Sequence, residues 1–191
     1  MIGNDIVDLR LAAVESNWRR KGFLEKVFTA NEQLMIFRSL QPDDLVWKLW
    51  SMKESAYKAR LRVQKKIKID PKTFECIVLS KNEGQVYCEG KTYATLSRTN
   101  KDFIHTIAYS EKLEIKLYQD IVMMNQTKGP SKALYKALIS AMALRMTWNK
   151  DAIVIEKNEL GIPELYRLDR KTSILCSLSH HGRYGSYITT C

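Results

Sequence analysis

Trp50-Ser51-Met52-Lys53-Glu54-Ser55-Ala56-Tyr57-Lys58 is the stretch that most constrains the interpretation of this chain. Glu54 and Lys58 are four residues apart, so on a helix they share one face, and Lys53 lies at the edge of that face. A carboxylate and two amines grouped in this way can hold a divalent cation together with a polyphosphate. The alternative is an ordinary exposed ion pair, which stabilises a helix by about 0.2–0.5 kcal/mol.

A second acid lies near the start of the chain, in Ile2-Gly3-Asn4-Asp5-Ile6-Val7-Asp8-Leu9. The β-branched, apolar character of residues 2–9 predicts a buried strand, on which a carboxylate is costly unless it is paired or bound to metal. We therefore expect Asp5 and Glu54 to bind a metal ion, against the alternative that Asp5 merely ends a strand or caps a helix. Asp8 would face the opposite side of the strand, and the sequence leaves open whether it binds metal.

The two motifs, in this order, resemble the 4'-phosphopantetheinyl transferase superfamily. Its members move the phosphopantetheine arm of coenzyme A onto a carrier-protein serine, and their pattern is a Gly-x-Asp strand followed by an aromatic-x-x-Lys-Glu-x-x-x-Lys helix. The resemblance implies that Asp5 and Glu54 hold Mg²⁺ and that Glu54 and Lys58 are catalytic. It also implies that Lys58 and Lys53 bind the phosphates of coenzyme A.

The C-terminal part resembles the same family less closely. Ser179 and His180 match its Ser-His motif, which implies that they contact the phosphates of the nucleotide. Gly161-Ile162-Pro163 resembles its Gly-Lys-Pro turn, with Ile162 in place of the lysine. In the two-domain transferases that activate peptide synthetases the Ser-His half comes first. Here the Asp/Lys-Glu half is N-terminal, as in the short holo-acyl-carrier-protein synthases, although this chain is longer than those.

The hydrophobic patterning predicts two α+β units. Residues 2–9 read as a strand, Thr29 and Glu32 form a capping box for a helix to about residue 40, and a second helix spans about 42–62. Apolar residues then alternate from 74 to 121, which is typical of an antiparallel meander. A polar stretch containing Gly129-Pro130 precedes a helix to about residue 148 and strands at 152–156, 174–178 and 184–189. We expect similar helix-plus-antiparallel-sheet subdomains at 1–125 and 131–191, joined by a linker at 126–130 and packed as a pseudo-dimer.

Composition limits the possible partners and the location of the protein. The net charge of +10 indicates an anionic partner, and an acidic carrier protein together with coenzyme A explains it without nucleic acid, for which no zinc-finger or RNP-like motif is present. We expect the carrier protein to dock near Arg10 and Arg19-Arg20-Lys21. The four cysteines lack C-x-x-C spacing and predict reduced thiols. With no apolar run of roughly 20 residues and no export signal, the expected location is the cytoplasm, without a membrane segment.

The sequence thus predicts a Mg²⁺-dependent enzyme that transfers phosphopantetheine from coenzyme A to an apo acyl or peptidyl carrier protein and releases 3',5'-ADP. The general base is either Glu54 or a metal-bound water. The alternative is a basic coenzyme A-, nucleotide- or nucleic-acid-binding protein without activity. Against it, Asp5 and Glu54 would repel phosphate unless a cation lay between them. Because the chain carries both half-units, we expect a monomer with one site at the seam between them. The sequence does not identify the carrier protein or the acyl groups tolerated on coenzyme A.

Overall fold

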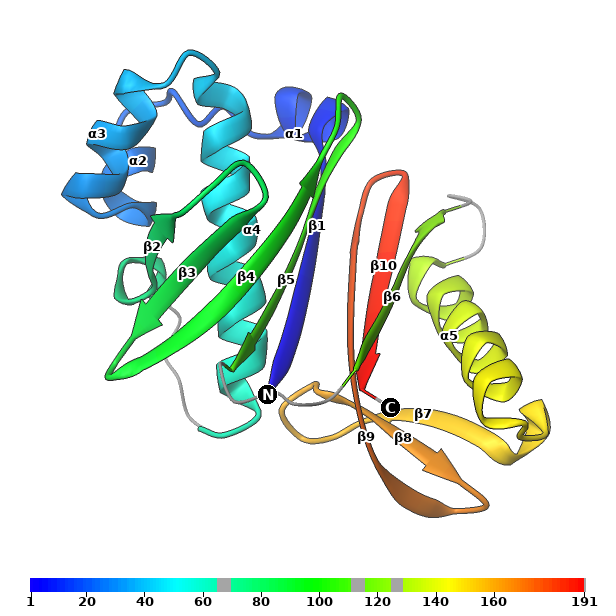
Figure 1. The fold of residues 1–191 in the computed structure, drawn as a ribbon. Coiled ribbons are helices and arrows are strands. Elements are labelled where there is room, and N and C mark those ends of the chain that lie inside the picture. The colour runs from blue at the N-terminus through cyan, green and yellow to red at the C-terminus, as the bar shows by residue number, and fades with distance from the viewer. Residues whose placement is uncertain (65–69, 111–115, 125–128, 191) are drawn as a thin grey trace.

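Two five-stranded antiparallel sheets with the same topology make up the protein (Figure 1). The computed structural model describes residues 1–64, 70–110, 116–124 and 129–190. The strand order is β1-β5-β4-β3-β2 in the first sheet and β6-β10-β9-β8-β7 in the second, so each strand has a counterpart in the other sheet. In each unit a long helix, α4 or α5, follows the first strand in the chain. The predicted α+β fold with two similar helix-plus-sheet subdomains packed as a pseudo-dimer is confirmed.

The first unit contains the strand and helix that carry the N-terminal motifs. Thr29 and Glu32 form the expected capping box, with the Thr29 hydroxyl accepting from the Glu32 N–H and the Glu32 carboxylate accepting from the Thr29 N–H. A proline at the first turn, Pro42, begins the long helix. The elements are β1 (Ile2–Asp8), α1 (Leu9–Glu15), α2 (Phe23–Val27), α3 (Ala30–Arg38), α4 (Pro42–Leu61), the short 3₁₀ helix η1 (Pro71–Thr73), β2 (Glu75–Val78), β3 (Glu83–Cys88), β4 (Lys91–Thr99) and β5 (Phe103–Ser110).

The second unit begins earlier than the sequence predicts. Its elements are β6 (Leu117–Met123), α5 (Pro130–Met146), the 3₁₀ helix η2 (Lys150–Ala152), β7 (Ile153–Lys157), β8 (Pro163–Arg167), β9 (Arg170–His181) and β10 (Tyr184–Thr190). Strand β6 pairs with β10 and so belongs to the second sheet, although residues 117–123 lie within the range expected for the first subdomain. The sequence pattern of a strand carries no information about which of two sheets the strand joins. Residues 126–128 of the predicted linker lie outside the described residues.

Strand β1 lies between the two units and has a different neighbour on each face. Val7 belongs to the apolar core around α4, and the backbone at Gly3 lies against that helix. The opposite face contributes Ile2 to a cluster with Ile188, and Ile6 to a cluster with Tyr184, both from the second sheet. The acid of the Gly-x-Asp motif therefore lies where the two halves meet.

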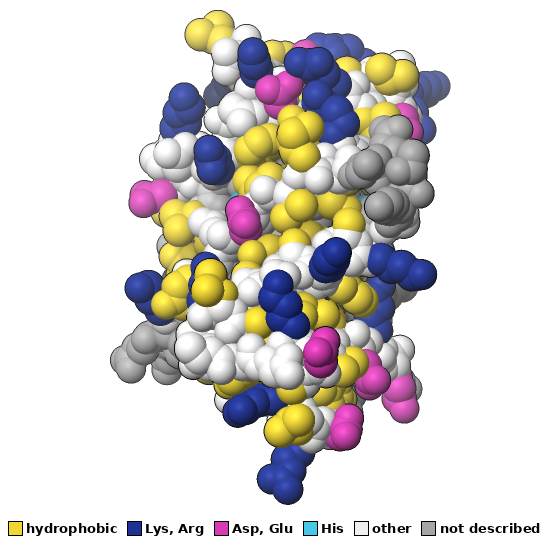
Figure 2. Space-filling model, turned by 90° about the vertical axis from the view of Figure 1, so that its right-hand side faces the viewer, with side chains coloured by type: hydrophobic (Ala, Val, Ile, Leu, Met, Phe, Trp, Pro, Cys, Tyr) yellow, Lys and Arg dark blue, Asp and Glu magenta, His cyan; other side chains and the backbone are white. Residues whose placement is uncertain are grey.

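Charged side chains are dispersed over the face shown in Figure 2, and the described cysteines lie in the interior. On the face shown in Figure 2, Lys and Arg side chains are scattered among apolar and uncharged atoms and do not form one continuous basic stripe. Within the described part of the chain, no helix has the length and apolarity needed to cross a membrane. Cys76, Cys88 and Cys176 are buried and unpaired.

Candidate functional site

A glycine allows helix α4 to lie directly on strand β1. A Cβ atom at Gly3 would lie 2.1 Å from the carbonyl oxygen of Ser55 and 2.6 Å from the backbone nitrogen of Ala59, distances that real Cβ atoms do not adopt. Only glycine fits this close approach. Since Glu54 and Lys58 flank this contact on the helix, the glycine brings their side chains toward Asp5, two residues further along the strand.

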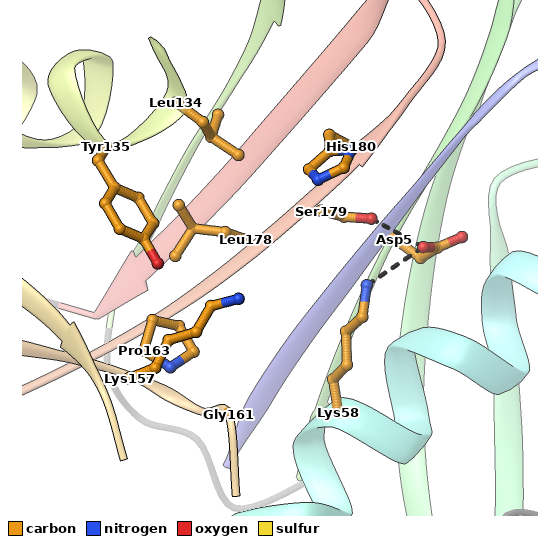
Figure 3. Close-up of a pocket in the computed structure, with 10 residues that line it drawn as sticks. All are labelled: Asp5, Lys58, Leu134, Tyr135, Lys157, Gly161, Pro163, Leu178, Ser179 and His180. Carbon is orange, nitrogen blue, oxygen red and sulfur yellow. Dashed lines mark hydrogen bonds and ion pairs between the residues drawn. The ribbon is translucent and has the colours of Figure 1, made fainter. Parts of the chain in front are cut away.

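Asp5 joins groups from both halves of the chain (Figure 3). Its Oδ1 atom lies 3.2 Å from the Lys58 ammonium and accepts a 2.8 Å hydrogen bond from the Ser179 hydroxyl. Lys58 also donates to the carbonyl oxygen of Asn4 at 2.9 Å, which fixes its ammonium at the edge of the strand. Residues 174 positions apart in the sequence are thereby brought into direct contact.

Glu54 supplies a second carboxylate beside Asp5. Burial raises the pKa of Glu54, the negative charge of Asp5 raises it further, and the positive charge of Lys58 acts in the opposite direction. Two carboxylates close enough to repel each other are a donor set that suits a hard divalent cation. Within the described ranges, no group of three or more His, Cys, Asp or Glu side chains is arranged so that it could hold a metal ion. A Mg²⁺ ion would therefore take its other ligands from water and substrate phosphate, as this ion commonly does.

A cavity of about 320 Å³ opens beside Asp5 at the seam between the halves. Figure 3 shows the ammonium of Lys157, the ring of His180 and the ammonium of Lys58 arranged around the same space. The wall contains residues of both units, from β1, α4, α5, β7, β8 and β9: Asp5, Lys58, Leu134, Tyr135, Lys157, Gly161, Pro163, Leu178, Ser179 and His180. Since Lys157 forms no ion pair with any described residue, the cavity offers a free positive charge.

His180 is exposed at the cavity and is electrostatically coupled to its lysines. Desolvation of the ring lowers the pKa of His180, and the positive charges of Lys58 and Lys157 lower it further. The free imidazole is therefore mostly neutral at pH 7, and an anion bound here would raise its pKa.

Lys53 is the one predicted binding residue that the structure places elsewhere. Its side chain is 2% exposed, forms a 2.8 Å ion pair with the fully buried Glu32, and donates to the carbonyl oxygens of Pro71 and Phe74. The ammonium is thus engaged inside the first unit and does not line the cavity at Asp5. Lys53 therefore lies apart from Lys58 and Lys157, whose ammonium groups face the cavity.

Lys157 lines the cavity although no sequence motif points to it. It matters because Ile162 stands where the family motif has a lysine. The turn that resembles Gly-Lys-Pro does line the cavity through Gly161 and Pro163, but Ile162 is buried. Lys157 pairs with Pro163 across β7 and β8 and brings an ammonium to this place. A usable signal existed, because Lys157 follows the buried Ile155 at a spacing of two and so lies on the same face of its strand.

Asp8 serves a different purpose from Asp5. Its carboxylate caps helix α1 by accepting from the Arg10 and Leu11 N–H groups, and it forms a 2.7 Å ion pair with Arg183. The hydrogen bonds from Arg183 hold the pKa of Asp8 well below its usual range. Both carboxylate oxygens of Asp8 accept hydrogen bonds from the protein. The structure therefore gives no support to a metal-binding role for Asp8, which the sequence had left open.

Comparison with known proteins agrees with the N-terminal motifs. A family model described as the 4'-phosphopantetheinyl transferase superfamily matches residues 1–108. Among solved structures, the holo-(acyl-carrier-protein) synthase of Thermotoga maritima is similar, with 12% identity, coverage of 73% of this chain and 89% of that chain, and a TM-score of 0.46. The search of curated proteins found no match. The matched range includes Asp5, Glu54 and Lys58, and it ends before Ser179 and His180.

Proposed function

This chain belongs to the 4'-phosphopantetheinyl transferase superfamily, and we propose that it transfers the phosphopantetheine arm of coenzyme A to a serine of an apo acyl or peptidyl carrier protein. The reaction is Mg²⁺-dependent and releases 3',5'-ADP. The observation that carries this proposal is the pair of carboxylates, Asp5 and Glu54, held beside Lys58 at the rim of a cavity with further positive charge.

Asp5 and Glu54 would hold the Mg²⁺ ion, which would supply positive charge against the pyrophosphate of coenzyme A. Lys58 is fixed by Asn4 and Asp5, so its ammonium is already oriented when charge develops on the transferred phosphoryl group. Glu54 accepts the proton of the carrier serine, directly or through a water molecule.

The remaining residues of the cavity bind the nucleotide end of coenzyme A. His180 and Lys157 lie around the same space as Lys58 and supply positive charge for the adenosine phosphates. The Ser179 hydroxyl is occupied, since it accepts from the Ile6 N–H at 3.3 Å and donates to Asp5. We therefore assign Ser179 to the orientation of Asp5 and the phosphate contact to its neighbour His180.

The carrier protein docks through positive charge beside α2. Arg10 and Arg19 are each already paired with an aspartate of this chain. Arg20 and Lys21 form no ion pair among the described residues and line a cavity together with the exposed Phe37. An acidic helix with an apolar residue would complement this surface, so Arg20 and Lys21 are better candidates for docking than Arg10.

Transfer is tested by incubating the protein with apo carrier protein, coenzyme A and Mg²⁺ and measuring the carrier by intact-protein mass spectrometry. We expect the carrier to gain the mass of one phosphopantetheine arm, and to gain nothing when EDTA replaces Mg²⁺. An unchanged mass with both acyl and peptidyl carrier proteins, from folded protein that binds coenzyme A, would leave a binding protein without transferase activity.

The nucleotide end is tested by titrating 3',5'-ADP calorimetrically into two lysine variants. Lys157→Met should weaken binding about tenfold, which corresponds to one charge-assisted hydrogen bond. Lys150→Met is the matched control, because Lys150 is exposed in the same unit and does not line the cavity. Equal affinity of both variants and the wild-type protein would remove Lys157 from the site.

A further inference from the structure

Side chains of β9 hold the outer edge of strand β1. Strand β1 ends the first sheet, so alternate backbone N–H groups point away from β5 and have no strand partner within that sheet. From Ser177 to His181, every second residue of β9 accepts from one of them, and we call these three contacts the rungs. The rungs join the N–H of Asn4 to Ser177 Oγ (3.2 Å), that of Ile6 to Ser179 Oγ (3.3 Å) and that of Asp8 to His181 Nδ1 (2.9 Å).

The rungs satisfy the edge of β1 without fully defining the register between the two strands. Ser177 and Ser179 are identical acceptors two residues apart, so a slip of two residues would still place Ser179 opposite the Asn4 N–H. Such a slip would carry His180 about 6.6 Å along β1. It would also remove the Ser179 hydroxyl from Asp5, with which it forms a 2.8 Å hydrogen bond in the native register.

Besides the buried hydrogen bond from Asn4 Nδ2 to Ser186 Oγ (2.8 Å), which joins β1 to β10, a contact at the end of the seam has no counterpart two residues away. Asp8, which is 1% exposed, accepts from Arg183 through the backbone N–H at 2.9 Å, through Nε at 2.8 Å and through Nη2 at 2.7 Å. The intervening Gly182 has φ +54°, and a Cβ there would lie 2.6 Å from Asp8 Oδ2. The β9–β10 turn thus fits around this carboxylate in one arrangement, with bidentate geometry that arginine favours.

We propose that Asp8 and Arg183 form a clasp that fixes the register of β9 along β1 and thereby positions His180 beside Asp5. The clasp is a positioning pair, because neither residue lines the cavity at Asp5. In this way the clasp would align the Ser-His motif of the second unit with the Gly-x-Asp strand of the first, within one chain. The inference rests on the proposed function only for the identity of the ligand that His180 binds.

The register is tested without any ligand by backbone amide hydrogen exchange measured by NMR. In Arg183→Met the three rung amides should exchange at least about tenfold faster, whereas the amides of Gly3, Asp5 and Val7, which face β5, should keep their protection. Arg183→Lys, which keeps the charge without the bidentate contact, should show a smaller effect and provides a folded variant if Arg183→Met does not fold. Lys171→Met is the control, since it breaks an exposed ion pair elsewhere on β9. Uniform loss of protection in β1, or none, would overturn the proposal.

A double-mutant cycle tests whether the clasp acts through His180. With the native clasp, His180→Ala should weaken binding of 3',5'-ADP about tenfold, and in the Arg183→Met or Arg183→Lys background it should have a much smaller effect. An undiminished effect of His180→Ala in the clasp variants would show that the clasp only stabilises the fold and would overturn the positioning role. Failure of wild-type protein to bind 3',5'-ADP or coenzyme A would instead contradict the proposed function. The exchange experiment would still decide the register.

Discussion

Replacing Gly3 by alanine should damage the site more than the fold. The new Cβ would lie 2.1 Å from the Ser55 carbonyl oxygen, whereas an ordinary carbon–oxygen contact needs about 3.4 Å, so helix α4 has to retreat by more than about 1 Å. Glu54 and Lys58 move with the helix and away from Asp5. A misplacement of about 1 Å can reduce a rate about 10²-fold, and overpacking of this kind costs about 1–3 kcal/mol of stability.

The assay is the initial rate of carrier modification, with the free energy of unfolding measured in parallel by urea titration. Gly84→Ala is the matched control, because its Cβ would lie 2.6 Å from Met52 Cε and 2.8 Å from the Ile77 carbonyl oxygen, in the same sheet but on β3. We expect both variants to lose stability and only Gly3→Ala to lose about 10²-fold in kcat/KM. Wild-type activity in Gly3→Ala, or equal loss in both variants, would refute the reasoning.

Three further predictions follow from the site. Asp5→Ala and Glu54→Ala should each abolish transfer while the circular dichroism spectrum stays native, because each removes a carboxylate of the proposed metal site; activity in either variant would contradict this assignment. The pKa of free His180 is lowered, and a bound phosphate favours the protonated ring, so affinity for 3',5'-ADP should rise as the pH falls from about 8 to 6.5, by at most about tenfold per pH unit. Calorimetry should show this rise diminished in His180→Ala, and an identical pH dependence in both proteins would refute it. Reversing Arg20 and Lys21 to Glu should raise the KM for carrier protein and leave that for coenzyme A unchanged, and added salt should act on wild-type protein in the same way; unchanged carrier kinetics would place docking elsewhere.

The local motifs could be predicted because their chemistry is local. The Gly-x-Asp strand, the capping box and the long helix that begins at Pro42 are specified by residues within a few positions of one another, and the structure has each of them. The repeat of one helix-plus-sheet unit was also readable from the order of the patterns. These features suffice to place Asp5, Glu54 and Lys58 on neighbouring elements.

The features that escaped prediction depend on partners distant in the sequence. Lys53 points into the first unit because Glu32, on another helix, is there to pair with it. The spacing of Ser177, Ser179 and His181 has a structural meaning only once β1 lies alongside, 173 residues away. The sequence of β6 reads as one more strand after β5, and only its pairing with β10 assigns it to the second sheet.

The central claim is that one chain builds one site from its two halves, and mixing two impaired variants tests it directly. Glu54→Ala lacks a group from the first unit, and His180→Ala, weakened in nucleotide binding, lacks one from the second. If the site lies within each chain, an equimolar mixture should transfer phosphopantetheine no faster than the sum of the two variants measured alone. Restoration of a substantial fraction of wild-type activity on mixing would show that the site forms between chains, and would contradict the account.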